Sequence, residues 1–134
     1  MAVSLPVSQR PSRRNWSVLT DMSEKDVLFL LPPGFAANDR REYCPECAEV
    51  WGLLHYYPAL KEVIEIRYVG IDHPRQPICD LLGDGQWNAP TLVLALNDSE
   101  WGSSAPSGQK ILGSAKEIAA YFATLYGTPV ARGS

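Results

Sequence analysis

The sequence predicts an α/β protein in which a four-stranded mixed sheet is flanked by three helices, in the order βαβαββα. Three patterns support this prediction. Residues 27–31 are all apolar and precede two prolines, as is typical of a short strand buried on both faces. Amphipathic helices are indicated after Pro45 and after Ser114, because apolar residues recur there at helical spacing. This order gives a sheet that is part parallel and part antiparallel.

The first half of the predicted fold contains two strands and two helices. A polar loop follows the strand at residues 27–31, and the next helix begins at Pro45, because proline is well tolerated in a first turn. Residues 64–68 alternate between apolar and charged side chains, which predicts the second strand. Residues 74–82 are a short helix candidate, which Gly83 is placed to end.

The second half of the predicted fold contains two strands and a helix. Residues 90–96 are almost all apolar and predict a buried strand, and a long polar loop separates them from a short strand at 111–112. Ser114 and Glu117 have the spacing of a capping box, and Gly127 stands where a glycine ends a helix. The last helix is therefore predicted from its first residue to its last.

Length and composition fit one ordinary domain. The chain has 134 residues, of which 46% are hydrophobic and 20% are charged, close to the average globular protein. Residues 1–20 carry three arginines and no acidic residue, so we expect residues 1–24 to be a flexible tail that is mobile in solution. The alternative is an organelle transit peptide. We predict a domain at residues 25–128 and a flexible C-terminus at 129–134.

Several classes of protein are disfavoured by the composition. No apolar run approaches the roughly 18 residues of a membrane-spanning helix, so no membrane partner is expected. The net charge is −3, and the basic residues beyond the N-terminus are scattered, so no nucleic-acid partner is expected either. Three cysteines are too few for a disulfide-rich secreted scaffold, and no signal peptide is visible. We therefore expect a reducing compartment, the cytoplasm.

The residues with recognisable chemistry are Cys44 and Cys47. Two cysteines three residues apart in a first helical turn are close enough to form a disulfide. Cys44 is predicted to be the N-cap, where unpaired backbone N–H groups and the helix dipole favour its thiolate, so it would be the attacking sulfur. Cys47 lies one turn into the helix on its apolar face and suits the resolving role. Pro45 keeps this turn stiff.

A Cys-x-x-Cys pair can instead be half of a zinc or iron–sulfur site, with further ligands from Cys79, His55 or His73. A second closely spaced pair is missing, however, and the first leads directly into an amphipathic helix, so redox chemistry is favoured and no metal is assigned. Cys79 is expected to be a buried apolar residue of the helix at 74–82.

The motif in its setting resembles the thioredoxin superfamily. A Cys-Pro-x-Cys sequence follows a buried strand, and a later strand opens with Ala89 and Pro90. The resemblance covers residues 26–127 and implies that Pro90 is cis and faces the dithiol. When residues 75–77 and 81–83 are included in the pattern, the chain is most similar to a bacterial thioredoxin-like family with no assigned substrate. The predicted supporting residues of the site are Tyr43, Pro45, Glu46, Ala89 and Pro90.

Residues 111–122 are similar to glutaredoxins and to the N-terminal domains of glutathione transferases. This resemblance implies that the Ala89 backbone pairs with glutathione and that Ser114 binds its γ-glutamyl end, so glutathione is a possible co-substrate. Ser114 is also sufficiently explained as a helix cap, and this explanation is favoured over glutathione binding.

The sequence thus predicts a thiol–disulfide oxidoreductase whose partner is a disulfide- or thiol-containing protein or glutathione. The alternative is a non-catalytic binding module of the same fold, and the third hypothesis is a Cys-x-x-Cys metal carrier.

Overall fold

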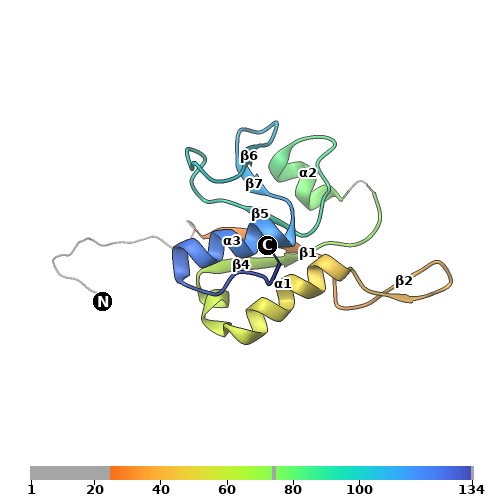
Figure 1. Ribbon diagram of the computed structural model, residues 1–134. Helices are drawn as coiled ribbons and strands as arrows, with labels where there is room; N and C mark the ends of the chain where they lie inside the picture. The colour runs from red at the N-terminus through yellow and green to blue at the C-terminus, as the bar shows by residue number, and fades with distance from the viewer. Residues whose placement is uncertain (1–24, 74, 134) are drawn as a thin grey trace.

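The computed structural model describes residues 25–73 and 75–133, and the tail predicted for residues 1–24 lies outside the described residues. It is an α/β structure, as the sequence predicts (Figure 1). The helices are α1 (Pro45–Tyr56), α2 (Gln76–Leu82) and α3 (Ala115–Tyr126), with a 3-10 helix η2 (Pro58–Glu62). The strands are β1 (Asp26–Leu30), β2 (Phe35–Ala37), β3 (Arg40–Glu42), β4 (Ile64–Tyr68), β5 (Thr91–Val93), β6 (Ser103–Ser104) and β7 (Lys110–Leu112).

The main sheet has five strands in the order β4-β1-β5-β7-β6. β1 is parallel to β4 and antiparallel to β5, and the remaining pairs are antiparallel, so the sheet is mixed. The prediction of four strands was wrong. The additional strand is β6, which consists of two exposed serines and therefore has no apolar periodicity to indicate a strand.

A second difference is the hairpin formed by β2 and β3, a segment predicted to be a polar loop. Its turn is made by Asn38 and Asp39, which both have positive φ (55° and 59°), as a tight two-residue hairpin turn requires. Arg40 donates to Glu42 at 2.8 Å, which lowers the pKa of this exposed carboxyl. The hairpin extends away from the sheet and helices in Figure 1.

The predicted strand at residues 90–96 is shorter in the structure. β5 ends at Val93, and Leu96, which the sequence assigns to the strand, is 64% exposed. The backbone still pairs with β7 one residue further, because Leu94 N–H donates to the carbonyl of Lys110. A bend at Ala95 and a turn at residues 97–98 then lead the chain out of the sheet.

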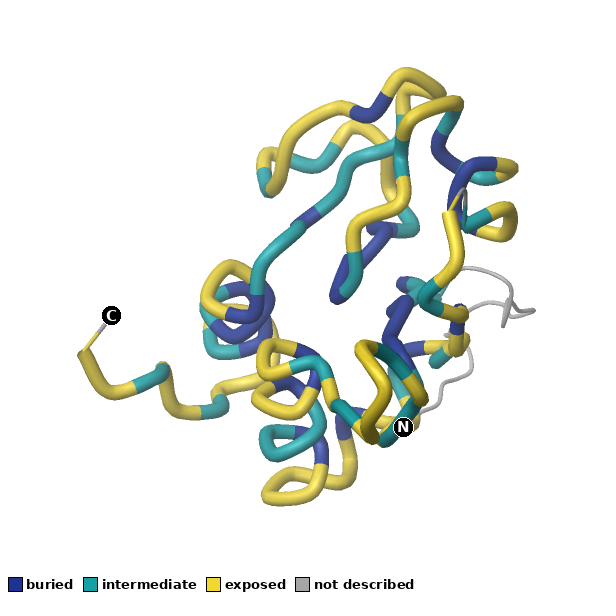
Figure 2. The backbone as a smooth tube through the Cα atoms, turned by 90° about the vertical axis from the view of Figure 1, so that its right-hand side faces the viewer, coloured by how far each residue is buried: buried dark blue, intermediate teal, exposed yellow. Residues whose placement is uncertain are grey.

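The core lies where the three helices pack on the central strands. α1 and α3 lie side by side, while α2 lies apart from both, near β7 (Figure 1). Figure 2 shows buried backbone in the interior of the molecule and exposed backbone along its outer loops. The fully buried large side chains come from all three helices and from β1 and β5: Leu28, Phe29, Leu30, Val50, Leu54, Ile78, Leu82, Thr91, Leu92, Ile118 and Phe122.

One buried carboxylate joins the sheet to α3. Asp26, at the start of β1, is 8% exposed. Its Oδ1 accepts from the Ala95 N–H at 2.7 Å, and its Oδ2 accepts from the Tyr121 hydroxyl at 2.7 Å. Burial, followed by hydrogen bonding to Asp26, raises the pKa of Tyr121 well above its usual value, so this residue remains a donor.

The cap predicted at the start of α3 is present, except that the returning bond from Glu117 is made with the residue before the N-cap rather than with the N-cap itself. Ser114 is the N-cap, and its Oγ accepts from the Glu117 N–H at 3.2 Å, while Glu117 Oε1 accepts from the Gly113 N–H at 3.3 Å. Gly127 ends the helix in the left-handed conformation with φ 77°.

Ser114→Ala is expected to lower the free energy of unfolding by about 0.5–2 kcal/mol, because one helix N–H loses its acceptor. Urea denaturation followed by circular dichroism measures this loss. The matched control is Ser107→Ala, since Ser107 lies exposed in a turn and its replacement should change stability by less than about 0.5 kcal/mol. Equal effects of the two substitutions would contradict the capping role.

Within residues 25–73 and 75–133, no helix is long and apolar enough to cross a lipid bilayer.

Candidate functional site

Cys44 lies at the N-cap of α1, the position predicted for it. Its backbone is extended (φ −82°, ψ 115°), and its Sγ accepts a hydrogen bond from the Cys47 N–H at 3.2 Å. The residue is half-buried, and its thiol is free. A sulfur in this place accepts a backbone N–H of the first helical turn that has no partner within the helix.

Cys47 lies one turn further along α1 and faces the core, where it is only 3% exposed. Its Sγ accepts from the Leu31 N–H at 3.4 Å, so this sulfur contacts the chain directly after β1. Burial, and then hydrogen bonding to Cys44, raises the pKa of Cys47 to about 12. The two thiols therefore have different environments, with Cys44 accessible and Cys47 enclosed and protonated.

This difference predicts a selective chemical modification. A limiting dose of iodoacetamide should label Cys44 and leave Cys47 unreacted between about pH 7 and about pH 10, because the thiolate is the nucleophile and Cys47 is a thiol throughout that range. Peptide mapping by mass spectrometry identifies the labelled sulfur.

Cys47 should become reactive only near pH 12 or when the chain unfolds. An unfolded cysteine ionises near pH 8.5, whereas native Cys47 holds its proton to about pH 12. The protonated Cys47 thiol therefore stabilises the folded state fully below about pH 8.5. This stabilisation is lost as the pH rises towards 12, because the unfolded chain then gains the ionised form first. Labelling of Cys47 ahead of Cys44 in the native protein would contradict the roles assigned to the two sulfurs.

The peptide bond between Ala89 and Pro90 is cis, as the family resemblance predicts. β5 begins one residue later, and its register pairs Thr91 with Phe29. Ala89 and Pro90 thus enter the sheet at the end of β1 that leads to Leu31, the residue bonded to Cys47. Contact between Pro90 and the Cys44 sulfur stays a prediction.

Asn88 fixes the loop that precedes β5. Its side-chain amide donates to the carbonyl of Gly113 at 2.8 Å and to that of Pro90 at 3.0 Å. Thr91 in turn donates its hydroxyl to the Asn88 carbonyl at 2.7 Å. The start of β5 and the residue before the Ser114 cap are therefore held together by a side chain to which the sequence analysis assigned no role.

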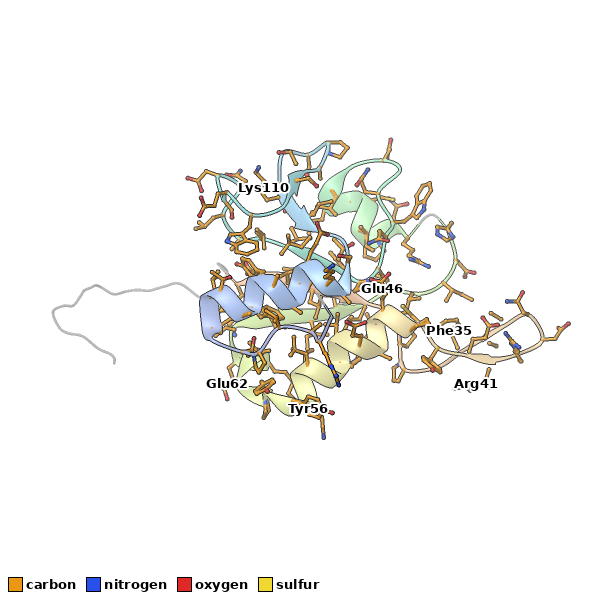
Figure 3. The ribbon with its side chains drawn as sticks, in the orientation of Figure 1. Phe35, Arg41, Glu46, Tyr56, Glu62 and Lys110 are labelled. Atoms are coloured by element: carbon orange, nitrogen blue, oxygen red, sulfur yellow. The ribbon has the colours of Figure 1, made fainter. Side chains whose placement is uncertain are left out.

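Glu46 and Ser114 meet at the start of α3. The Glu46 side chain comes from the second residue of α1, and its Oε1 accepts from the Ala115 N–H at 3.0 Å. Figure 3 shows Glu46 where the N-terminal ends of α1 and α3 approach each other. The structure thus brings the predicted supporting residue Glu46 together with the predicted glutathione residue Ser114.

An apolar groove opens beside the dithiol. It has a volume of about 380 Å³ and includes both sulfur-bearing residues. Trp51 and Tyr68 stack against each other with ring centroids 6.4 Å apart. Tyr43 is 64% exposed, so its ring is available at the mouth of the groove. The lining residues are Leu31, Pro32, Pro33, Tyr43, Cys44, Cys47, Ala48, Trp51 and Tyr68.

Arg75 is a residue of the site whose role the sequence analysis missed. It is the N-cap of α2, and its Nη1 donates to the Trp87 carbonyl at 2.7 Å. Its buried Nε forms no hydrogen bond within the described part of the chain. The positive charge of Arg75 lowers the pKa of Cys47, although burial outweighs it. No spacing rule connects this arginine with a motif almost thirty residues earlier.

The remaining cysteine and the histidines are not gathered at the dithiol. Cys79 is buried on α2, as expected, and its Sγ donates to the Gln86 carbonyl at 3.3 Å. The His73 ring packs edge-on against Trp87, and the His55 ring lies next to that of Tyr56. Across residues 25–73 and 75–133, no three side chains of the His, Cys, Asp or Glu type come together as a metal site.

Comparison with known proteins identifies a family. The family model described as "Protein of unknown function (DUF3088)" matches residues 25–130, which include every helix and strand of the structure. No curated protein and no solved structure matches the chain. The match spans well over half of the sequence, and the chain therefore belongs to the DUF3088 family.

Proposed function

We propose that this protein is a thiol–disulfide oxidoreductase with a thioredoxin-like fold, in which Cys44 attacks and Cys47 resolves. The observation that carries the proposal is the asymmetry of the pair. Cys44 Sγ is half-buried and accepts a backbone N–H at the start of α1, whereas Cys47 Sγ lies in the core. An accessible sulfur beside a protected one is the arrangement that two-step disulfide exchange requires.

The topology supports the thioredoxin-like part of the proposal. The central strand β1 has β4 parallel on one side and β5 antiparallel on the other, and β7 continues the sheet antiparallel to β5. The Cys-Pro-Glu-Cys motif opens α1 after β1, and a cis-proline precedes β5. These are the features on which the resemblance to that superfamily depends.

The proposed reaction transfers two electrons from the dithiol to a substrate disulfide. The Cys44 thiolate attacks one substrate sulfur, forms a mixed disulfide and releases the other sulfur as a thiolate, which takes a proton from water. Cys47 then loses its proton to solvent, and its sulfur attacks that of Cys44. The Cys44–Cys47 disulfide forms, the second substrate thiolate leaves and is protonated, and an external dithiol later reduces the protein.

The environment of Cys47 sets the order of these steps. Part of the increase in its pKa comes from hydrogen bonding to Cys44 and from the charge of that sulfur. Both contributions end when Cys44 becomes part of a neutral mixed disulfide, so the Cys47 proton is then lost more easily. The charge of Arg75 also favours the Cys47 thiolate, although its effect on the pKa is the smallest of those acting on this residue.

The groove indicates which disulfide is the substrate. Its apolar lining next to Cys44 suits a polypeptide with an apolar side chain near its cysteine. We expect the protein to act in a reducing compartment such as the cytoplasm, because the proposed cycle begins from the dithiol.

The test is a disulfide-exchange assay on a fluorescent peptide disulfide, with dithiothreitol as the external dithiol. Cys44→Ser should abolish exchange by removing the nucleophile. The matched control is Cys79→Ser, which removes a thiol bonded to Gln86 rather than to the motif and should leave the rate within about twofold. If the native protein and Cys44→Ser both exchanged the peptide disulfide no faster than dithiothreitol alone, the oxidoreductase proposal would be rejected. A non-catalytic binding module would then be favoured.

A further inference from the structure

The start of α3 is already occupied by a carboxylate of the same chain. A helix start offers several backbone N–H groups without an intrahelical partner, and these groups together with the helix dipole attract anions. At α3 the Ala115 N–H donates to Glu46 at 3.0 Å, and the Glu117 N–H donates to Ser114 at 3.2 Å. Two of the donors that an incoming carboxylate would use are thus bonded to side chains of the protein.

Glu46 lies between the nucleophile and α3. It follows Cys44 by two residues, and its backbone belongs to the first turn of α1. A small anionic thiol that placed its sulfur at Cys44 and its carboxylate at the start of α3 would have to displace the Glu46 carboxylate. Displacement breaks a charge-assisted hydrogen bond and brings two negative charges close together, and both effects oppose binding.

The Glu46 side chain is exposed to solvent, but its carboxylate is held at this position. The bond to the Ala115 N–H is partly buried and joins two helices that pack on each other. The positive end of the α3 dipole favours a carboxylate at this point. Ser114 is held as well, since its Oγ both accepts from the Glu117 N–H and donates to Glu117 Oε1 at 3.1 Å.

We propose that Glu46 is a specificity-determining residue, which excludes glutathione and other small anionic disulfides from the dithiol by occupying the N-terminus of α3. The inference rests on the proposed function, because it assigns a preference to the same dithiol. Substrates without a carboxylate at that position enter through the apolar groove beside Cys44.

The test compares two disulfides of different charge, oxidised glutathione and the neutral hydroxyethyl disulfide. Glu46→Ala should increase the rate of exchange with oxidised glutathione at least about tenfold, the effect expected from one charge-assisted hydrogen bond. The rate with hydroxyethyl disulfide, which has no carboxylate to bind at α3, is the reference, so that any general effect of the substitution on the dithiol is divided out and the ratio of the two rates should rise at least about tenfold. An unchanged rate with oxidised glutathione would overturn the proposal.

Two further variants distinguish the bond of the Glu46 carboxylate to α3 from a general repulsion between negative charges. Glu46→Gln keeps an oxygen that accepts from Ala115 N–H but removes the charge, so its rate with oxidised glutathione should lie between those of the native protein and Glu46→Ala. Glu49→Ala removes an exposed carboxylate from the same helix that, within the described part of the chain, forms no hydrogen bond with α3, and its rate should equal the native rate. An equal increase for Glu49→Ala and Glu46→Ala would also overturn the proposal.

A binding measurement keeps the inference independent of activity. S-methyl glutathione cannot exchange, and in Glu46→Ala it should shift the Ala115 amide resonance at millimolar concentration, whereas in the native protein it should not. Shifts of equal size in both proteins would reject the role of Glu46. Absence of exchange in every variant with either disulfide would instead reject the proposed oxidoreductase function, while the amide shifts would still report on Glu46.

Discussion

The Cys47→Ser protein is expected to accumulate as a mixed disulfide between Cys44 and its substrate. Cys44 keeps its place at the N-cap of α1 and can still attack, but the sulfur that would release the substrate is absent. We expect the lifetime of the mixed disulfide to increase by at least about a hundredfold, since release then depends on an external thiol. Non-reducing gel electrophoresis and mass spectrometry detect the adduct.

Two controls make this experiment decisive. Cys44→Ser should form no adduct, because Cys47 is enclosed in the core and holds its proton. The double variant Cys47→Ser with Cys79→Ser should form as much adduct as Cys47→Ser alone, since the Cys79 thiol is buried on α2. Adduct formation at Cys79 or Cys47 would show that the nucleophile has been misassigned.

The second large effect concerns stability. Asp26→Ala should lower the free energy of unfolding by about 2–4 kcal/mol, because the Tyr121 hydroxyl and the Ala95 N–H both lose their acceptor in a buried place. The midpoint of urea denaturation measures the loss. Asp26 stands at the opposite end of β1 from Leu31, so the folded variant should keep its exchange rate.

A double-mutant cycle isolates the bond between the two side chains. Tyr121→Phe removes the hydroxyl but keeps the ring, and should cost about 1 kcal/mol. Adding this substitution to Asp26→Ala should cost less than the two single losses together, because the donor left unpaired is removed. If the losses of the two single variants simply added in the double variant, the 2.7 Å bond between Tyr121 and Asp26 would contribute nothing to stability.

The elements that the sequence predicted well have local signals. α3 begins after Ser114 and ends before Gly127 because one residue accepts the Glu117 N–H and the other adopts a positive φ. α1 begins at Pro45 for an equally local reason, and the positions of Cys44 and Cys47 follow from the helix itself. A dithiol motif at a helix start could therefore be placed from spacing alone.

The features that were missed depend on weak or distant signals. β2 and β3 are three residues each and partly exposed, so the only indication of a hairpin was Asn38-Asp39, two residues that tolerate a positive φ. The bond from Ala115 to Glu46 joins residues 69 positions apart. Such a pairing results from the packing of α1 on α3, and no pattern within either helix indicates it.

The position of β1 also has consequences for how the chain folds. β1 lies in the middle of the sheet, although it precedes β4 and β5 in the sequence. The partners of Asp26 lie 69 and 95 residues later, so long loops must close before this anchor forms. A growing polypeptide on the ribosome therefore carries an apolar strand with at least one unpaired edge until β5 emerges, and it is most vulnerable to aggregation during that interval.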